Sequence, residues 1–392
     1  MKRICVVTGS RAEFGLLRGL MEEIRAHDAL ELQVAVTGMH LSPEFGLTVT
    51  EVEEDFHVDR QVEMLLSSDS AAGVAKSMGL GLIGFADAWQ ELRPDLVVLL
   101  GDRFEIFAAA AAALVARIPI AHLHGGETTE GAFDEAIRHS LTKMAQLHFV
   151  ATEDYRRRVL QLGEDPRHVH LVGGLGIDAI SRVRMLDRDA LEHALGMRFG
   201  ARNLLVTFHP ATLDEGGAAR QMRALLEALD TLPETRLIFT LPNADTEGRA
   251  LIPLIEEFVA ARPHARAYPS LGQLRYLSCL QFVDGVVGNS SSGLLEAPSF
   301  AIGTVNIGMR QRGRLKAASV IDCEADSAAI AAALQRMFSA DFRKTLPGVR
   351  NPYGEPGAAR RIVAALAATP LVGLVRKTFH DIPCEANNCG QQ

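Results

Sequence analysis

Short, continuous apolar runs alternate with longer stretches of helical length along the chain. Each run holds about four to six apolar residues, which is typical of strands whose two faces are both covered by helices. In the first half, the pattern predicts strands over 4–9, 32–38, 95–102, 118–126, 147–153 and 169–174. Helices are expected over 16–24, 72–92, 104–116 and 133–145. This repeated β–α–β order predicts a parallel, doubly wound sheet.

The pattern restarts near residue 175, beginning with a charged, linker-like helical stretch over 178–198. Strands are then predicted over 204–210, 236–243, 265–268, 283–291, 302–308 and 318–323. Helices are predicted over 215–231, 248–261 and 355–368. We therefore expect two Rossmann-like domains, 1–175 and 176–355, followed by a closing helix and a polar tail over 356–392. Ligands of open α/β sheets bind beyond the carboxyl ends of the strands, so two such domains facing each other predict a site in the cleft between them.

Composition narrows the class of protein. The chain has 392 residues, of which 48% are hydrophobic and 22% charged, and these values exclude a disordered or fibrous protein. The formal net charge of −8 argues against a nucleic-acid partner. The longest wholly apolar run, Ile106–Ala116, is too short to span a membrane. Five cysteines without a CxxC motif favour a reduced, cytoplasmic chain, with Cys384 and Cys389 as two loose thiols rather than a metal pair.

Two motifs of the first half follow predicted strands. In TGSRAEFG, Arg11 stands at a helix start whose N–H groups could meet an anion, although a solvated arginine is the alternative. The motif is not GxGxxG, so it gives little support to dinucleotide binding. In GDRFE, Asp102 suits catalysis and helix capping equally well, because Glu105 would complete a capping box. Arg103 adds a cation at the same strand end.

The richest segment, HLHGGETTEGAFDEAIRHSLTK, spans residues 122–143. Gly125 and Gly126 permit a sharp turn that would bring Glu127 into the site. Asp134 and Arg138 are spaced i,i+4 on one predicted helix, so they could hold each other in place. The HxH of His122 and His124 raises a metal alternative, which we rate low because no third ligand has suitable spacing. One of these histidines is expected to point into the core.

In the second half, His209 of TFHP ends a predicted strand, either as a core histidine or as a phosphate or substrate contact. Asn243 ends the next strand as a candidate polar contact. GNSSSG, with Ser290 and Ser291, opens a short helix and resembles a diphosphate cradle more than a plain capping cluster. Glu296 would suit ribose hydroxyls. Some of the three arginines of RQRGR should face an anionic ligand, and a solvated charge patch is the alternative for Arg312 and Arg314.

Together, TGSRAEFG, GDRFE, HGGE, DEAIRHSLTKM and GNSSSGLLEAPS resemble the hydrolysing UDP-N-acetylglucosamine 2-epimerases of bacterial sialic acid synthesis. The resemblance runs from about Lys2 to Pro383, and it implies the GT-B fold of nucleotide-sugar enzymes. It also implies a reaction in which UDP-GlcNAc and water give UDP and N-acetylmannosamine, through loss of UDP and hydration of a 2-acetamidoglucal. Neither a cofactor nor a metal is implied, and a homo-oligomer, either a dimer or a tetramer, is expected.

Matching the motifs residue by residue, the resemblance implies that Asp102, Glu127 and Asp134 are the catalytic carboxylates, without assigning which of them removes the C2 proton. Contacts to the UDP-sugar are implied for Arg11, Arg103, Arg138, His209, Asn243, Ser290, Ser291, Glu296 and Arg310. Of these, Glu296 is expected at the ribose.

Several alternatives stay open. Related enzymes act on a UDP-linked 2,4-diacetamido-2,4,6-trideoxy sugar in legionaminic acid synthesis and share most of these motifs. Non-hydrolysing epimerases carry HxEAG where this chain has HGGE, which favours release of the free sugar. A GT-B glycosyltransferase would bind the same donor but would not need Glu127 and Asp134 together. A nucleotide-sugar sensor would not need the carboxylates, and an oxidoreductase lacks its glycine motif.

Overall fold

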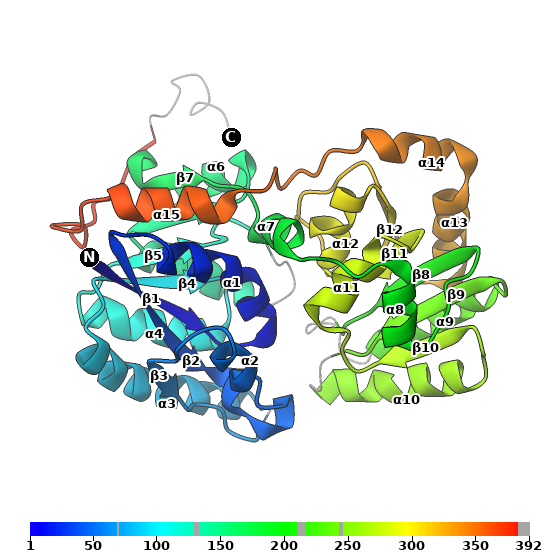
Figure 1. The fold of residues 1–392 in the computed structure, drawn as a ribbon, viewed down its shortest axis with the longest axis horizontal. Coiled ribbons are helices and arrows are strands. Elements are labelled where there is room, and N and C mark those ends of the chain that lie inside the picture. Colours follow the sequence, from blue (N-terminus) through cyan, green and yellow to red (C-terminus); the bar gives the residue numbers. More distant parts are fainter. Residues whose placement is uncertain (69, 129–132, 211–216, 243–245, 383–392) are drawn as a thin grey trace, which may run out of the picture. The chain divides into compact units, whose positions relative to one another are not determined.

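The computed structural model describes residues 1–392 except 69, 129–132, 211–216, 243–245 and 383–392 (Figure 1). The chain forms two compact units. The first comprises Met1–Glu127, Asp134–Leu175 and the described part of Pro356–Gln392. The second comprises Gly176–Glu355 and the described ends of Thr128–Phe133. Among the described residues, no helix combines the length and apolar character needed to cross a bilayer.

The first unit is built on a seven-stranded sheet in the order β3-β2-β1-β4-β5-β6-β7. All of its strand pairs are parallel. The strands are β1 (Lys2–Thr8), β2 (Leu30–Thr37), β3 (Arg60–Val62), β4 (Leu96–Leu100), β5 (Ile120–Leu123), β6 (Leu147–Val150) and β7 (Val169–Leu171). The strand order reverses between β1 and β4, and the carboxyl ends of strands at such a switch point are where ligands of open sheets bind.

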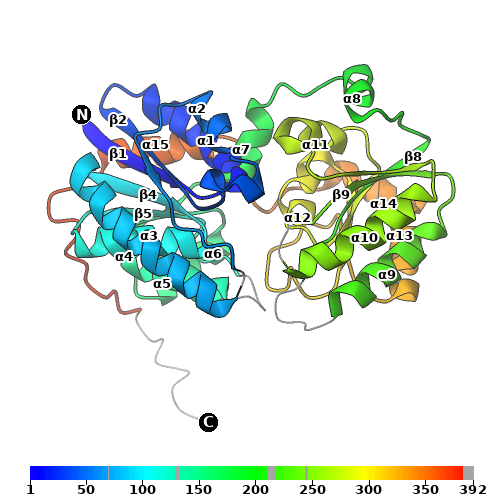
Figure 2. The ribbon, with the colours of Figure 1, turned by 90° about the horizontal axis from the view of Figure 1, so that it is seen from below.

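Helices cover both faces of this sheet and thereby bury its central strands on both sides (Figure 2). The helices of the first unit are α1 (Arg11–Arg25), α2 (Val49–Glu53), α3 (Ala71–Leu92), α4 (Phe104–Val115), α5 (Asp134–Met144), α6 (Glu153–Gln161) and α15 (Ala358–Ala368). One apolar cluster packs α1, α2 and α15 on one face, and another packs α3, α4 and α5 on the opposite face. The closing helix α15 therefore belongs to the first unit, although it follows the second in sequence.

The second unit repeats the plan with a six-stranded sheet in the order β10-β9-β8-β11-β12-β13. Its strands are β8 (Arg202–Thr207), β9 (Thr235–Thr240), β10 (Ala265–Tyr268), β11 (Gly285–Gly288), β12 (Gly303–Ile307) and β13 (Val320–Cys323), all paired in parallel. Its helices are α7 (Leu175–Arg182), α8 (Arg188–Leu195), α9 (Gly217–Asp230), α10 (Thr246–Ala260), α11 (Gly272–Leu280), α12 (Ser292–Leu295), α13 (Ser327–Phe338) and α14 (Ala340–Thr345). The switch point here lies between β8 and β11. Both sheets confirm the predicted pair of doubly wound α/β domains.

The structure departs from the predicted elements at a few places. The helix predicted over 178–198 is divided into α7 and α8, because Asp187 caps the start of α8 by accepting a hydrogen bond from Ala190 N at 2.9 Å. The elements β3, α2, α6, α11, α13 and α14 were not predicted. Of these, β3 and α2 are too short to carry a periodic signal, whereas α13 has twelve residues and was simply missed. Short 3-10 turns occur at Gly38–Leu41, Pro43–Phe45, Pro166–His168, Ala297–Phe300 and Leu346–Gly348.

Candidate active site

Asp102 lies just beyond the carboxyl end of β4, beside the switch point of the first sheet. The helix-capping interpretation of Asp102 is wrong, because α4 begins after Arg103 and no side chain caps its start. The carboxylate of Asp102 instead forms an ion pair with Arg138 of α5. Its side chain is 18% exposed, so the group is shielded but still reachable.

Arg138 is the cation around which the carboxylates of the first unit gather. Its residue is only 3% exposed, and its Nη1 donates to His124 O at 2.9 Å. The same Nη1 lies 3.9 Å from Glu127 Oε2. Burial opposes the charged form, but Asp102 and Glu127 raise the pKa of Arg138 above its usual value. Among the ion pairs of the described residues, Arg138 joins Asp102 and Glu127 rather than Asp134, so the predicted i,i+4 pair was wrong.

Glu127 reaches this cation through the glycine turn that follows β5. Gly126 has a φ of +77°, and a Cβ there would overlap the backbone of Tyr155, so only glycine allows this path. The preceding His124 also adopts the left-handed region, at a φ of +64°, which costs strain in a residue with a side chain. In this conformation, His124 Nδ1 lies 2.9 Å from Glu127 Oε1. The turn thus buries Glu127 to 3% exposure between a histidine and an arginine.

Asp134 is the first residue of α5 and is half-buried. Burial raises its pKa, and the nearby charge of Asp102 raises it further, while Arg103 and Arg138 oppose the shift. A carboxyl group with a raised pKa can hold or release a proton closer to neutral pH than an ordinary aspartate. Asp134 is therefore a candidate acid–base group of this cluster.

His122 is a structural histidine. Its Nε2 lies 2.7 Å from Gly101 O, and its Nδ1 lies 3.1 Å from Thr142 Oγ1. Burial lowers the pKa of His122 to about 3, so the ring is neutral. The expectation that one histidine of the HxH points into the core is thereby confirmed. Within the described parts of the chain, no group of three or more His, Cys, Asp or Glu residues is placed to hold a metal ion.

Arg103 is paired with two carboxylates. Its Nη2 donates to Glu105 Oε1 at 2.7 Å, and its Nε lies 3.8 Å from Glu13 Oε1. Burial acts against the charged guanidinium, but Glu105 and Glu13 together raise the pKa of Arg103. The carboxylates of Glu105 and Glu13 hold Arg103 in place. The charge of Asp134 also acts on Arg103, and that of Asp102 acts on Glu13.

Sequence reasoning missed Glu13, although its position gave a signal. Ser10 caps α1 by accepting from Glu13 N at 3.4 Å, and Glu13 Oε2 accepts from Gly9 N at 2.7 Å. Ser10 and Glu13 thus form a variant of the capping box, in which the glutamate accepts from the N–H of the residue before the cap instead of from the cap itself. The Ser-x-x-Glu spacing in TGSRAEFG predicts this pattern. Burial raises the pKa of Glu13 to about 7, with Arg103 opposing the shift.

Glu13→Gln is expected to make folding less sensitive to pH. The folded-state pKa of Glu13 lies at about 7, above the usual value of 4.5 for a glutamate, so this group favours folding below pH 4.5 and loses that contribution as the pH rises through 7. The shift corresponds to roughly 3 kcal/mol of unfolding free energy. Urea unfolding at about pH 5 and about pH 8 should show a smaller loss of stability for the variant than for the parent protein. Glu22→Gln, on a more exposed part of α1, is the control, and equal losses in parent and Glu13→Gln would refute the prediction.

Arg11 lies in a surface ion pair. Its side chain is 46% exposed, and its Nε lies 3.0 Å from Glu51 Oε2 of α2. A guanidinium in an exposed pair is only weakly held, so it can exchange its carboxylate for another anion. This geometry is compatible both with the anion contact and with the solvated arginine that the sequence left open.

In the second unit, Asn289 joins the ends of two neighbouring strands. Its Oδ1 accepts from His209 N and its Nδ2 donates to His209 O, both at 2.7 Å. Its own carbonyl oxygen accepts from Arg310 Nη1 at 3.0 Å and from Gln311 Nε2 at 2.8 Å. Asn289 is 2% exposed, so this arrangement is rigidly packed. Sequence reasoning missed this residue, because only the serines of GNSSSG were singled out.

His209 and Arg310 are thus brought together at the switch point of the second sheet. Burial, followed by the charge of Arg310, lowers the pKa of His209 to about 4. The imidazole is therefore neutral at pH 7 and can both donate and accept a hydrogen bond. Beside it, the guanidinium of Arg310 supplies a fixed positive charge suited to a phosphate group.

The GNSSSG turn depends on glycine at its start. Gly288 ends β11 with a φ of +134°, and a Cβ there would overlap the carbonyl oxygen of Thr207 in β8. Ser291 occupies the capping position of α12, but its side chain makes no capping hydrogen bond, which weakens the plain-cap interpretation. Tyr276 OH donates to Ser292 Oγ at 2.7 Å and Ser292 N donates to Ser290 Oγ at 3.4 Å.

Two of the predicted nucleotide contacts remain, Glu296 and Asn243. Glu296 directly follows α12 and is half-buried. Asn243 lies outside the described residues. The structure therefore collects Asp102, Glu127, Asp134 and Arg138 in the first unit and His209, Ser290, Ser291 and Arg310 in the second.

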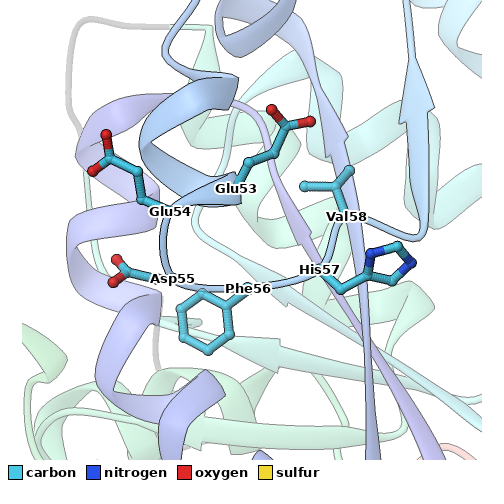
Figure 3. Close-up of a pocket in the computed structure, with 6 residues that line it drawn as sticks. All are labelled: Glu53, Glu54, Asp55, Phe56, His57 and Val58. Carbon is cyan, nitrogen blue, oxygen red and sulfur yellow. The ribbon is translucent and has the colours of Figure 1, made fainter.

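A surface pocket in the first unit lies elsewhere in the chain. Figure 3 shows that it is formed by the consecutive residues Glu53–Val58, between α2 and β3. Glu53, Glu54 and Asp55 give it three carboxylates, and such a lining repels a diphosphate. None of the predicted site residues lines this pocket.

The fold and these residues define a class: a protein of two parallel α/β units, with a carboxylate cluster beside Arg138 in one and the GNSSSG turn in the other. Residues 22–367 match the family model of UDP-N-acetylglucosamine 2-epimerase, and the chain belongs to this family.

Several known proteins are similar to the chain over nearly its whole length. It is 39% identical to the GDP/UDP-N,N'-diacetylbacillosamine 2-epimerase (hydrolyzing) of Campylobacter jejuni, over 97% of this chain and 99% of that protein. It is 37% identical to polysialic acid biosynthesis protein P7 of Escherichia coli, over 98% of each. The solved structure of UDP-GlcNAc 2-epimerase from Neisseria meningitidis bound to UDP-GlcNAc superposes with a TM-score of 0.82. That match has 18% identity and covers 94% of this chain and 100% of the other, and it supports the fold.

Proposed function

We propose that this protein is a hydrolysing 2-epimerase of a UDP-linked 2-acetamido sugar. It would convert the sugar nucleotide and water to UDP and the free sugar with inverted configuration at C2. The observation that carries the proposal is the cluster of Asp102, Glu127 and Asp134 around one buried arginine at the switch point of the first sheet. A protein that only binds or transfers a sugar has no need for three carboxylates placed in this way.

The chemistry requires groups that take up and return a proton. A carboxylate removes the proton from C2, the C1–O bond breaks, and its electron pair leaves with UDP, so that a double bond forms between C1 and C2. Water then adds its hydroxyl to C1, and a proton returns to C2 on the opposite face. Asp134, whose pKa is raised, is suited to carry a proton in this sequence, while Arg138 compensates the negative charge of Asp102 and Glu127.

The second unit would bind the nucleotide. Arg310 supplies a fixed charge for the diphosphate, neutral His209 a switchable hydrogen bond, and the serines of GNSSSG additional hydroxyl donors. We assign Glu296 to the ribose and keep Arg11, Arg103 and Asn243 as further contacts to UDP.

Two substrates are proposed. UDP-GlcNAc, which would yield N-acetylmannosamine, is the substrate that the motifs suggest. UDP-N,N'-diacetylbacillosamine is the second candidate, and it is supported by relatives at 39% and 33% identity whose names carry that substrate. The relative named for polysialic acid biosynthesis, at 37% identity, supports the first.

Proton NMR of the purified protein with each substrate in deuterated water tests the proposal. We expect stoichiometric UDP and a free sugar that carries deuterium at C2 and is inverted there. The substrate with the larger kcat/KM identifies the specificity. Formation of an epimerised UDP-sugar would indicate a non-hydrolysing enzyme, and inertness toward both substrates would favour a glycosyltransferase.

A further inference from the structure

The chain that follows α15 returns to the end of α5, the helix that carries Asp134 and Arg138. Lys377 of this returning segment directs its ammonium group at the last turn of α5. It donates to the carbonyl oxygens of Thr142 at 3.2 Å, Lys143 at 2.8 Å and Ala145 at 2.6 Å. The last carbonyls of a helix have no partner within the helix, and a cation is most stabilising at that end. Lys377 therefore acts as a C-terminal cap supplied by a distant part of the chain.

A buried carboxylate completes this cap. Glu164 is 1% exposed and follows α6. Its Oε2 lies 2.6 Å from Lys377 Nζ and 2.9 Å from His148 Nε2, and its Oε1 lies 2.7 Å from Lys143 Nζ. Burial opposes ionisation, but the hydrogen bonds from His148, Lys143 and Lys377 lower the pKa of Glu164 to about 2. The carboxylate is thus charged throughout the neutral range, and it ties the returning segment to α5 and β6.

A second attachment lies two residues further on. The ring of Phe379 packs so closely on Gly163 that a Cβ there would overlap it. His380 N donates to Gly163 O at 2.9 Å, and the Phe379 ring lies 5.0 Å from Lys143 Nζ. We call residues 369–382 the C-terminal strap. It is fixed to the first unit at both Lys377 and Phe379.

Hydrogen bonds connect the capped end of α5 to the carboxylate cluster. Because a carbonyl oxygen only accepts, His122 Nε2 must donate to Gly101 O, which leaves Nδ1 of the neutral ring as an acceptor. The Thr142 hydroxyl lies 3.1 Å from both His122 Nδ1 and Arg138 O, and it shares its single proton between these two acceptors. Gly101 is the residue before Asp102. The helix end held by Lys377 is thus joined to the Asp102 loop through His122, while Arg138 on the same helix binds the Asp102 side chain.

We propose that Lys377 is a positioning residue for the carboxylate cluster, and that the C-terminal strap sets the position of α5 relative to β4. This inference rests on the proposed function, since it concerns the geometry of Asp102, Asp134 and Arg138. A shift of α5 would move Asp134 and Arg138 together away from the Asp102 loop. Because displacements of about 1 Å can cost up to 10²-fold in rate, the strap is expected to affect kcat more than substrate affinity.

The test compares Lys377→Met with Arg376→Met, an exposed neighbour on the strap whose loss removes the same charge. We expect Lys377→Met to lower kcat about tenfold with KM changed less than about twofold, and Arg376→Met to behave like the parent protein. The pH dependence of kcat should shift only in Lys377→Met, because the surroundings of Asp134 change. Lys377→Arg should recover part of the rate, since it restores the charge.

Hydrogen exchange of the amides of α5, measured without substrate, separates this proposal from the proposed function. Faster exchange in α5 of Lys377→Met supports the strap even if no substrate is turned over, whereas inactivity of the parent protein refutes only the proposed function. If Lys377→Met does not fold, Phe379→Ala replaces it in these measurements, because it releases the strap without removing a buried charge. Unchanged kcat, pH profile and α5 exchange in the folded variant would overturn the proposal.

Discussion

Glu127→Gln is expected to lower kcat by about 10²- to 10⁴-fold while UDP binds as tightly as before. The substitution keeps the shape of a side chain that is 3% exposed, but it removes the charge that faces His124 and Arg138. A glutamine cannot take up the proton that the proposed elimination removes or returns. UDP release under saturating substrate measures kcat, and calorimetry with UDP measures affinity.

The same result is expected for Asp102→Asn and Asp134→Asn, because each removes one carboxylate of the cluster. Glu153→Gln, at an exposed carboxylate on α6 of the same unit, is the matched control and should leave kcat unchanged. The contrary outcome is a loss of UDP binding in all three site variants. That result would assign the cluster to nucleotide binding or to folding rather than to proton transfer.

Arg138→Met is expected to lower both stability and kcat. Arg138 is 3% exposed and pairs with Asp102, with Glu127 Oε2 3.9 Å away. Removing one partner of a buried ion pair leaves an uncompensated charge, which costs roughly 3–5 kcal/mol of unfolding free energy. The remaining carboxylates would repel each other, and the pKa of each would rise in the folded state.

That mechanism predicts a characteristic pH dependence. A carboxyl group whose folded-state pKa is raised favours folding at low pH and loses this contribution as the pH rises. In urea unfolding, the difference in unfolding free energy between Arg138→Met and the parent protein should therefore become smaller toward pH 5. Combining Arg138→Met with Asp102→Asn should recover much of the lost stability, since the unpaired charge is then absent. A difference in unfolding free energy that is independent of pH and unaffected by the second substitution would contradict a charge-based explanation.

The sequence by itself determined the order of elements and the positions of the polar motifs. Apolar runs followed by helix-length stretches predict both parallel sheets, because strands buried on two faces must be apolar throughout. The motifs of Asp102, Glu127 and Ser290 follow directly after predicted strands, and parallel strands present their carboxyl ends along one edge of a sheet. Short elements such as β3 and α2 escaped prediction, since a few residues carry too little periodicity to identify them.

Only the tertiary structure decided which polar groups meet. Spacing along one helix suggested Asp134 as the partner of Arg138, yet the loop after β4 brings Asp102 to it from 36 positions away in sequence. The same local logic suggested a cap for Asp102, and it could not indicate that Glu13 lies beside Arg103, which is on a different element. Likewise, Asn289 and Lys377 act on backbone groups distant in sequence. Periodicity and capping are local properties, whereas the pairing of buried charges depends on strand order. The sequence therefore indicated the polar candidates, and the fold determined which of them interact.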